Sequence, residues 1–187
     1  MRIAPELFEM TRSFRRVFHK CERLRLMISR PIVDDARLNL YERYHIDRQT
    51  LRGWEYEQIG QFDYYEYFVD HAQDYGYEFA YYYYDRLAAV ALVDLLPTGL
   101  SAVYCYYDPE LKHLSLGTYS ILRQILFAKE HGFAHLYLGY SVEGNASLSY
   151  KMRFHPREML VGSYDLRDEP IWIKEPFDGE SFATDTD

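Results

Sequence analysis

The stretch Tyr77–Tyr107, YEFAYYYYDRLAAVALVDLLPTGLSAVYCYY, decides the fold of this chain. Its apolar and aromatic runs predict three strands, at Tyr77–Tyr84, Leu87–Leu95 and Leu100–Tyr107. Two short turn signals, Asp85-Arg86 and Pro97-Thr98-Gly99, separate the runs. Links this short join neighbouring strands that run in opposite directions, so the stretch predicts an antiparallel meander.

A long helix and a further strand are predicted after the meander. Ser115–His131 has an apolar stripe at helical spacing, and Gly132 stands where a helix C-terminus favours glycine. Ala134–Val142 is the next apolar run. The order of meander, helix and strand predicts an α/β protein with a GNAT-like acyltransferase fold, in which helices flank a mixed, largely antiparallel central sheet. Fold order alone does not establish a function.

The outer elements follow from local patterns. The predicted helices are 12–20, a helix capped by Asp34 or Asp35 that runs to about Arg48, Phe62–Gln73 and Ser147–Phe154. The predicted strands are Cys21–Ser29 and Met159–Tyr164. Phe62 and Tyr65 are expected on the apolar face of their helix. Residues 1–175 are predicted to form one domain, and 176–187 an acidic flexible tail.

Composition excludes several classes of protein. No run reaches the ~18 apolar residues of a membrane helix, and the first residues lack the apolar block of a signal peptide, so a cytoplasmic protein without membrane contact is expected. The only cysteines, Cys21 and Cys105, form no CxxC pair, which excludes a disulfide framework and zinc-finger spacings. GxGxxG, Walker A, GxSxG and HExxH motifs are absent, and no metal site is expected.

The charge is unevenly distributed. The net charge is −8, yet residues 1–30 contain eight Arg or Lys against three Glu. A basic cluster of this kind can bind a phosphate backbone locally, and the alternative is a solvated helix face. Its members are Arg12, Arg15, Arg16, Lys20, Arg23 and Arg25.

Several short motifs in order carry a resemblance to a known family. They are Gly-Leu-Ser-x-Val-Tyr at 99–104, Asp-Pro at 108–109, Ser-Leu-Gly-Thr-Tyr at 115–119, Tyr-Leu-Gly-Tyr at 137–140 and Tyr-Lys-x-x-Phe-x-Pro at 150–156. The front segment, Thr-Arg-Ser-Phe-Arg-Arg-Val at 11–17, matches a further motif. Over about residues 2–165 the chain resembles the C-terminal domain of arginyl-tRNA–protein transferases and of the bacterial aspartate/glutamate leucyltransferases.

The resemblance implies transfer of an amino acid from charged tRNA to an amine of a peptide, protein or small-molecule acceptor. Aminoacyl-tRNA is then a co-substrate, and no other cofactor is expected. Because the donor ester is already activated, the protein mainly positions the reactants and stabilises the developing oxyanion. An arginine donor requires a carboxylate in its pocket, and Asp94, Asp108 and Glu143 are candidates, which favours arginine slightly over leucine.

The resemblance also implies site residues. Lys151, Tyr140 and Glu143 are the catalytic candidates, with Lys151 contacting the 3′-terminal adenosine or stabilising the leaving oxygen. The expected substrate and tRNA contacts are Arg12, Arg15, Arg16, Asp108, Ser115, Gly117, Thr118, Tyr119, Gly139, Tyr150 and Arg153. Several of these residues have structural alternatives: Ser115 as a helix cap, Asp108 as a turn residue, Tyr140 as a core tyrosine, Glu143 in solvent, and Arg15 and Arg16 as surface charge.

The chain also departs from the family pattern. The family's cysteine-rich N-terminal region is missing, so a helper protein that replaces it is a further expected partner. Ser141, Ser147, Leu148, Asn145 and Phe14 differ from the family's residues, which leaves the transferred amino acid and the acceptor open. Two other functions remain: a non-catalytic module that binds tRNA or a partner, and an acyl-CoA-dependent N-acyltransferase. An acyl-CoA enzyme of this fold would bind the cofactor's pyrophosphate through the backbone amides of a loop with two glycines, or a glycine and an alanine, before the long helix. The equivalent residues here, 112–118, contain one glycine only, which disfavours acyl-CoA binding.

Overall fold

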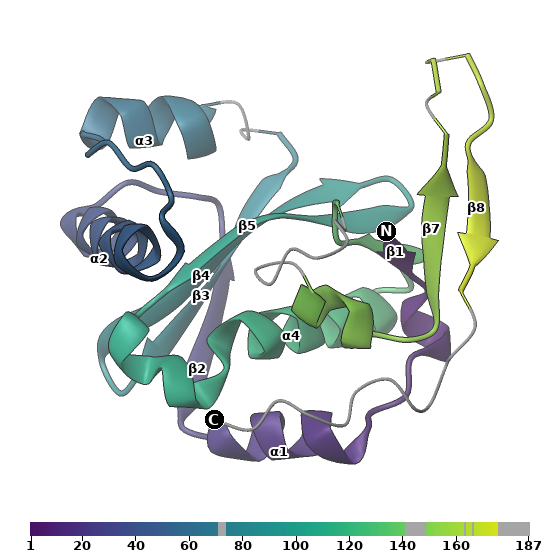
Figure 1. Ribbon diagram of the computed structural model, residues 1–187, viewed down its shortest axis with the longest axis horizontal. Helices are drawn as coiled ribbons and strands as arrows, with labels where there is room; N and C mark the ends of the chain where they lie inside the picture. Colours follow the sequence, from purple (N-terminus) through teal and green to yellow (C-terminus); the bar gives the residue numbers. More distant parts are fainter. Residues whose placement is uncertain (71–73, 141–148, 163, 166, 176–187) are drawn as a thin grey trace.

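The computed structural model describes residues 1–70, 74–140, 149–162, 164–165 and 167–175. Its centre is a sheet with the strand order β2-β3-β4-β5-β6-β1-β7-β8 (Figure 1). The strands are β1 Arg2–Ile3, β2 Leu24–Ser29, β3 Gly76–Tyr83, β4 Arg86–Leu96, β5 Gly99–Tyr107, β6 His135–Tyr137, β7 Arg157–Val161 and β8 Ile171–Lys174. The α-helices are α1 Arg12–Lys20, α2 Asp35–Arg52, α3 Gln61–Phe68 and α4 Leu116–Glu130, and the 3₁₀ helices are η1 Pro5–Leu7, η3 Pro109–Leu114 and η4 Ser149–Arg153.

The predicted meander is confirmed. β2, β3, β4 and β5 pair in sequence, each antiparallel to the next. The helix α4 then carries the chain back to β6, which pairs parallel with β5. The sheet is therefore mixed and mostly antiparallel, as the pattern of apolar runs and short turns indicated.

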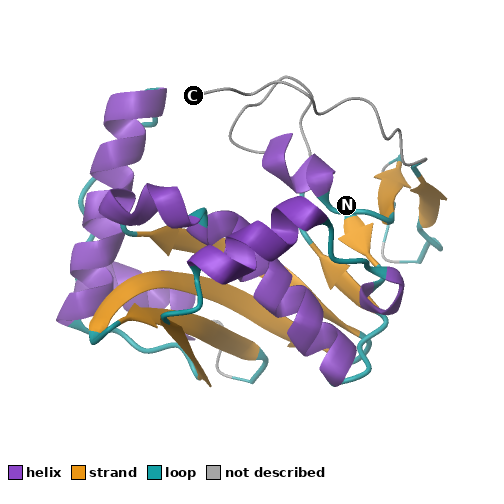
Figure 2. Ribbon diagram, turned by 90° about the horizontal axis from the view of Figure 1, so that it is seen from below, coloured by secondary structure: helices purple, strands orange, loops and turns teal. Residues whose placement is uncertain are grey.

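Two hydrophobic clusters cover the two faces of the sheet. One cluster joins α1 and α4 to one face, and the other joins α2 and α3 to the opposite face. β4 supplies residues to both clusters, which explains why its sequence is almost entirely apolar. Figure 1 shows α2 and α3 apart from α1 and α4, and Figure 2 shows the curvature of the long strands.

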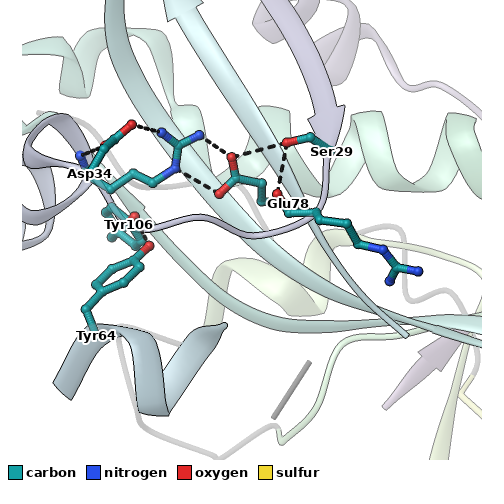
Figure 3. Close-up of polar contacts among 7 residues, drawn as sticks. Ser29, Asp34, Tyr64, Glu78 and Tyr106 are labelled. Atoms are coloured by element: carbon teal, nitrogen blue, oxygen red, sulfur yellow. Dashed lines mark hydrogen bonds and ion pairs between the residues drawn. The ribbon is translucent and has the colours of Figure 1, made fainter. Parts of the chain in front are cut away.

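A buried ion pair fixes the start of α2 against β3. Arg37 donates through Nε to Glu78 Oε2 at 2.9 Å and also pairs with Asp34, and Glu78 is fully buried. Asp34 caps α2 by accepting from the backbone N–H of Arg37 at 2.8 Å. The Tyr64 and Tyr106 hydroxyls lie 2.6 Å apart in the same region (Figure 3). These contacts attach α2 and α3 to the sheet.

Several predicted boundaries were wrong. The helix predicted at Phe62–Gln73 ends at Phe68, and Phe62 is 70% exposed because the buried face carries Tyr64 instead. The helix predicted to run to about Arg48 continues to Arg52, where Gly53 adopts a left-handed conformation.

Near the C-terminus, the strand predicted at Ala134–Val142 is only His135–Tyr137, and residues 141–142 lie outside the described part. The predicted helix Ser147–Phe154 is a 3₁₀ helix over Ser149–Arg153. The strand predicted at Met159–Tyr164 spans Arg157–Val161, and β8 was not predicted. The predicted acidic tail, 176–187, is outside the described residues.

Candidate functional site

A cavity opens where β5 and β6 separate. These parallel strands pair only from Gly99–Ser101 to His135–Tyr137. Beyond that point a cavity of about 380 Å³ is lined by β5, by Leu138 after β6, and by the start of α4. We call it the β5–β6 cavity. Its lining residues are Tyr44, Arg48, Arg52, Trp54, Ala102, Val103, Tyr104, Cys105, Tyr107, Lys112, Ser115, Leu116, Gly117, Thr118, Ser120, Ile121, Gln124, Leu138, Tyr150 and Lys151.

A β-bulge lies beside this cavity. Leu92 pairs with Tyr104, but Val93 pairs with Ala102, so Val103 has no partner in the ladder. A bulge bends its strand and redirects the local side chains. The Val103 side chain is half exposed and lines the β5–β6 cavity.

The described lining of the β5–β6 cavity is basic. It contains Arg48, Arg52, Lys112 and Lys151 and no carboxylate, in a chain whose net charge is −8. Arg48 is ion-paired with Asp47, and its guanidinium lies 5.3 Å from the Tyr44 ring centre. The cavity therefore attracts anions even though the molecule as a whole is acidic.

Lys151 lies deepest among these cations. Its ammonium donates to the carbonyl of Leu138 at 2.7 Å. Leu138 is the first residue after the pairing of β5 with β6 ends. Burial lowers the pKa of the Lys151 side chain, because the charged form loses solvation. An anionic oxygen in the cavity would restore part of that lost solvation.

The first turn of α4 forms another wall. Ser115 occupies the N-cap position of α4 with a left-handed backbone (φ 56°), but its side chain makes no capping hydrogen bond. Gly117 and Thr118 follow it along the cavity. The first N–H groups of a helix lack intrahelical partners and favour negative charge. A Cβ at Gly117 would lie 3.6 Å from the Tyr107 ring and 3.9 Å from the Tyr150 hydroxyl, so bare backbone faces both rings.

Two predicted contacts do not fit the structure. Tyr119 is 4% exposed and packs edge-on against Phe18 and Tyr81, so it does not reach a substrate. Asp108 is 0% exposed, and its carboxylate pairs with Arg86 and Arg43 and accepts from the backbone N–H of Glu110. Asp108 is a turn residue, as the structural alternative predicted, and the two arginines already compensate the charge of its carboxylate.

Other predicted residues lie outside the lining. Tyr140 is 86% exposed, and Gly139 adopts φ 72° just after β6. Glu143 lies outside the described residues. For Tyr140, Gly139 and Glu143, the predicted roles stay predictions.

The basic helix α1 runs beside the cavity walls. At one end, Arg153 of η4 donates to Ser13 at 3.3 Å. At the other end, Lys20 donates to the carbonyl of His113, the residue after Lys112. Three exposed arginines lie on α1: Arg12, Arg15 and Arg16. The helix therefore presents positive charge, and its two contacts are with residues one or two positions along the chain from cavity residues.

Sequence reasoning missed the contribution of α2. Tyr44, Arg48 and Arg52 all line the β5–β6 cavity. Their spacing of four residues places them on one face of a helix, and this signal was present in the sequence. Lys112 was not predicted as a site residue, and the structure places it in the lining of the β5–β6 cavity. Among the described residues, no group of His, Cys, Asp and Glu could hold a metal ion. No described helix has the length and apolarity needed to cross a bilayer.

Comparison with known proteins agrees with this architecture. Residues 36–161 match the model of the family described as "Arginine-tRNA-protein transferase, C terminus". An aspartate/glutamate leucyltransferase of Campylobacter jejuni is 36% identical over 175 residues, which cover 93% of this chain and 73% of the relative. The enzyme of the same name from Helicobacter hepaticus is 38% identical, covering 88% of this chain and 68% of the relative.

The solved structures show the fold. An aminoglycoside acetyltransferase from an uncultured soil metagenomic sample superimposes with a TM-score of 0.52 at 12% identity, covering 77% of this chain and 96% of that one. This likeness confirms the GNAT-like fold. The matched family model and the extent of identity with the leucyltransferases place the chain in the arginine-tRNA–protein transferase family of aminoacyltransferases.

Proposed function

We propose that this protein transfers leucine from leucyl-tRNA to the N-terminal amine of acceptors that begin with aspartate or glutamate. The observation that carries the proposal is the basic β5–β6 cavity, which lies at the parting of the two parallel strands. Both relatives described above are named aspartate/glutamate leucyltransferases. Their names supply the leucine donor and the acidic acceptor.

The sequence favoured arginine over leucine, and we replace that preference. It depended on carboxylates near the site, but Asp108 is buried in ion pairs with arginines. The described lining contains no carboxylate that would bind a guanidinium. Its apolar wall, which includes Leu116, Ile121 and Leu138, suits an aliphatic side chain.

The residues of the cavity have separate roles in this proposal. Arg48, Arg52 and Lys112 bind phosphates of the single-stranded 3′ end, and the tyrosine rings stack on its bases. The N–H groups at the start of α4 stabilise the oxyanion that forms on the ester carbonyl. Lys151 stabilises the ribose oxygen as it leaves. The arginines of α1 bind phosphates further along the acceptor stem.

A transfer assay tests the proposal. The protein is incubated with radiolabelled leucyl-tRNA or arginyl-tRNA and with a peptide that begins with glutamate. We expect labelled peptide from leucyl-tRNA and at least tenfold less from arginyl-tRNA. Binding of tRNA without transfer would instead support a non-catalytic module. A thermal shift with acetyl-CoA and no transfer from either tRNA would support an acyl-CoA enzyme.

A further inference from the structure

A second, smaller cavity lies on the other side of Val103. It has a volume of about 180 Å³ and is lined by β3, β4, β5 and α3. We call it the Asp94 cavity. Its lining residues are Pro31, Tyr67, Phe68, Tyr75, Gly76, Tyr77, Leu92, Val93, Asp94 and Val103. Drug-sized ligands occupy about 300–1,000 Å³, so this cavity suits a smaller group.

Asp94 is the one charged residue in this described lining. It is partly buried, and the described contacts give its carboxylate neither an ion pair nor a hydrogen bond. Burial raises the pKa of the Asp94 carboxyl, because its ionised form loses solvation without compensation. A partly buried carboxylate that has no pairing cation is suited to bind a cationic ligand.

The walls of the cavity also suit a cation. Tyr67, Phe68, Tyr75 and Tyr77 line the same cavity as Asp94, and aromatic faces attract positive charge. Arg30 lies over the Tyr77 ring at 4.3 Å, but it donates to the backbone carbonyls of Gly76 and Asp74. The nearby arginine is therefore bound elsewhere and leaves Asp94 unpaired.

The two cavities are adjacent. Val103, the bulged residue of β5, lines both of them. A group bound in the Asp94 cavity therefore lies next to the β5–β6 cavity. A transferase requires this arrangement, because the acceptor nitrogen must reach about 3–3.5 Å from the donor carbon.

We propose that the Asp94 cavity is the acceptor subsite, in which the Asp94 carboxylate binds the α-ammonium group of the acceptor's N-terminal residue and takes up its proton. The free amine then attacks the ester carbon, the amide bond forms as the ester C–O bond breaks, and the ribose oxygen leaves and takes up the second proton of the amine. This assignment rests on the proposed function, since it takes the β5–β6 cavity as the donor site. The aromatic rings flank the ammonium group, and Val103 borders both the acceptor and the donor cavity. The volume of the cavity, about 180 Å³, suits the end of a chain.

Two acceptors distinguish the subsite from the donor site. Hydroxylamine attacks the ester of leucyl-tRNA without needing a peptide subsite, whereas a peptide that begins with glutamate requires one. For Asp94→Asn we expect the KM for the peptide to rise at least tenfold. We also expect peptide transfer to fall at least tenfold more than hydroxylamine aminolysis. Asp74→Asn removes an exposed carboxylate outside the cavity and should leave both reactions as in the wild type.

The outcomes separate the two proposals. An unchanged peptide KM in Asp94→Asn overturns the acceptor assignment, and so does an equal loss of both reactions, which would place Asp94 on the donor side. A wild-type protein that accelerates neither reaction overturns the proposed function itself. As a second measurement, a glutamate peptide with a free amine should inhibit hydroxylamine aminolysis in the wild type. Its N-acetylated form should inhibit far more weakly, and equal inhibition by both contradicts ammonium binding.

Discussion

Lys151 places a positive charge at the point where β5 and β6 separate. Its ammonium is bonded to Leu138 at the point where β5 and β6 separate, and burial lowers its pKa. The backbone carbonyl alone does not neutralise this charge. The ammonium therefore gains most from an anionic oxygen that develops during the reaction, which is the condition for rate acceleration rather than tight ground-state binding.

Replacing Lys151 by methionine should lower kcat for leucyl transfer about 10²-fold or more, because the stabilisation of the leaving oxygen is lost. The KM for leucyl-tRNA should change less than kcat. The matched control is Lys174→Met, which removes an exposed lysine from β8 outside both cavities. Steady-state kinetics of both variants check the prediction, and equal kinetics would remove Lys151 from the reaction.

Asp94 should reduce the stability of the fold at neutral pH. Its pKa is raised by burial, so the folded protein holds the proton more tightly than the unfolded chain does. Stability from this group is present below the ordinary pKa of about 3.9 and is lost as the pH rises through the raised value. Asp94→Asn should therefore have a higher Tm than the wild type at pH 7, and the difference should vanish near pH 3. A lower Tm at pH 7 would indicate an unrecognised partner of Asp94.

Among the elements, α2 has two functions at its two ends. Its first turn is attached to β3 by Arg37 and Glu78, and its last turns bring Arg48 and Arg52 to the β5–β6 cavity. The attachment thus positions cavity residues that lie about three turns further along a rigid helix. The ion pair also specifies how α2 lies against the sheet.

Arg37→Ala should lower the free energy of unfolding by about 3–5 kcal/mol, because Glu78 would remain buried without a partner. The double variant Arg37→Met/Glu78→Leu should recover most of that loss, since two apolar side chains of similar volume need no partner. Urea unfolding of the wild type and both variants measures the effect. A loss below about 1 kcal/mol in the single variant, as for an exposed pair, would contradict the importance of this contact.

The exposed face of α1 should contribute to tRNA affinity through charge alone. Arg15→Glu/Arg16→Glu should weaken tRNA binding at least tenfold at low salt, and the deficit should shrink as salt rises. A matched control, Arg167→Glu/Lys174→Glu, reverses two exposed charges beyond β7 and at β8. Binding isotherms at several salt concentrations provide the measurement. Equal weakening in both pairs would mean that only net charge matters.

The elements near the middle of the chain could be predicted because their signals are local. Turn residues separate β3, β4 and β5, and the apolar stripe and Gly132 define α4. β8 has only four residues and depends on pairing with β7, which no local pattern encodes. β6 was predicted too long because its length is set by where its pairing with β5 ends. The apolar pattern of its own residues does not encode that point.

Part of the site could also be predicted from short motifs of the sequence. The motif residues Lys151, Ser115, Gly117, Thr118 and Tyr150 come together around one cavity. Tyr119 and Asp108 belong to the same motifs, but their side chains serve packing and a turn. A motif identifies a neighbourhood, and only the structure shows which of its side chains face the cavity.

At the scale of the whole molecule, the basic cavity lies at the point of the sheet where β5 and β6 separate. The chain has a net charge of −8, yet both α1 and the β5–β6 cavity carry positive groups. The bulge at Val103 places the Asp94 cavity directly beside the β5–β6 cavity. One residue of β5 therefore borders both the cavity proposed for the donor and the cavity proposed for the acceptor.

The most direct test of the central claim is the affinity of the β5–β6 cavity for the charged end of a tRNA. The probe is an acceptor-stem minihelix whose 3′-adenosine carries leucine through a stable amide. We predict that the wild type binds it at least tenfold more tightly than the uncharged minihelix, and that Arg48→Ser/Lys112→Ser weakens binding at least tenfold while keeping the wild-type circular dichroism spectrum. Equal affinity for the charged and uncharged forms, unaffected by the double substitution, would contradict the account.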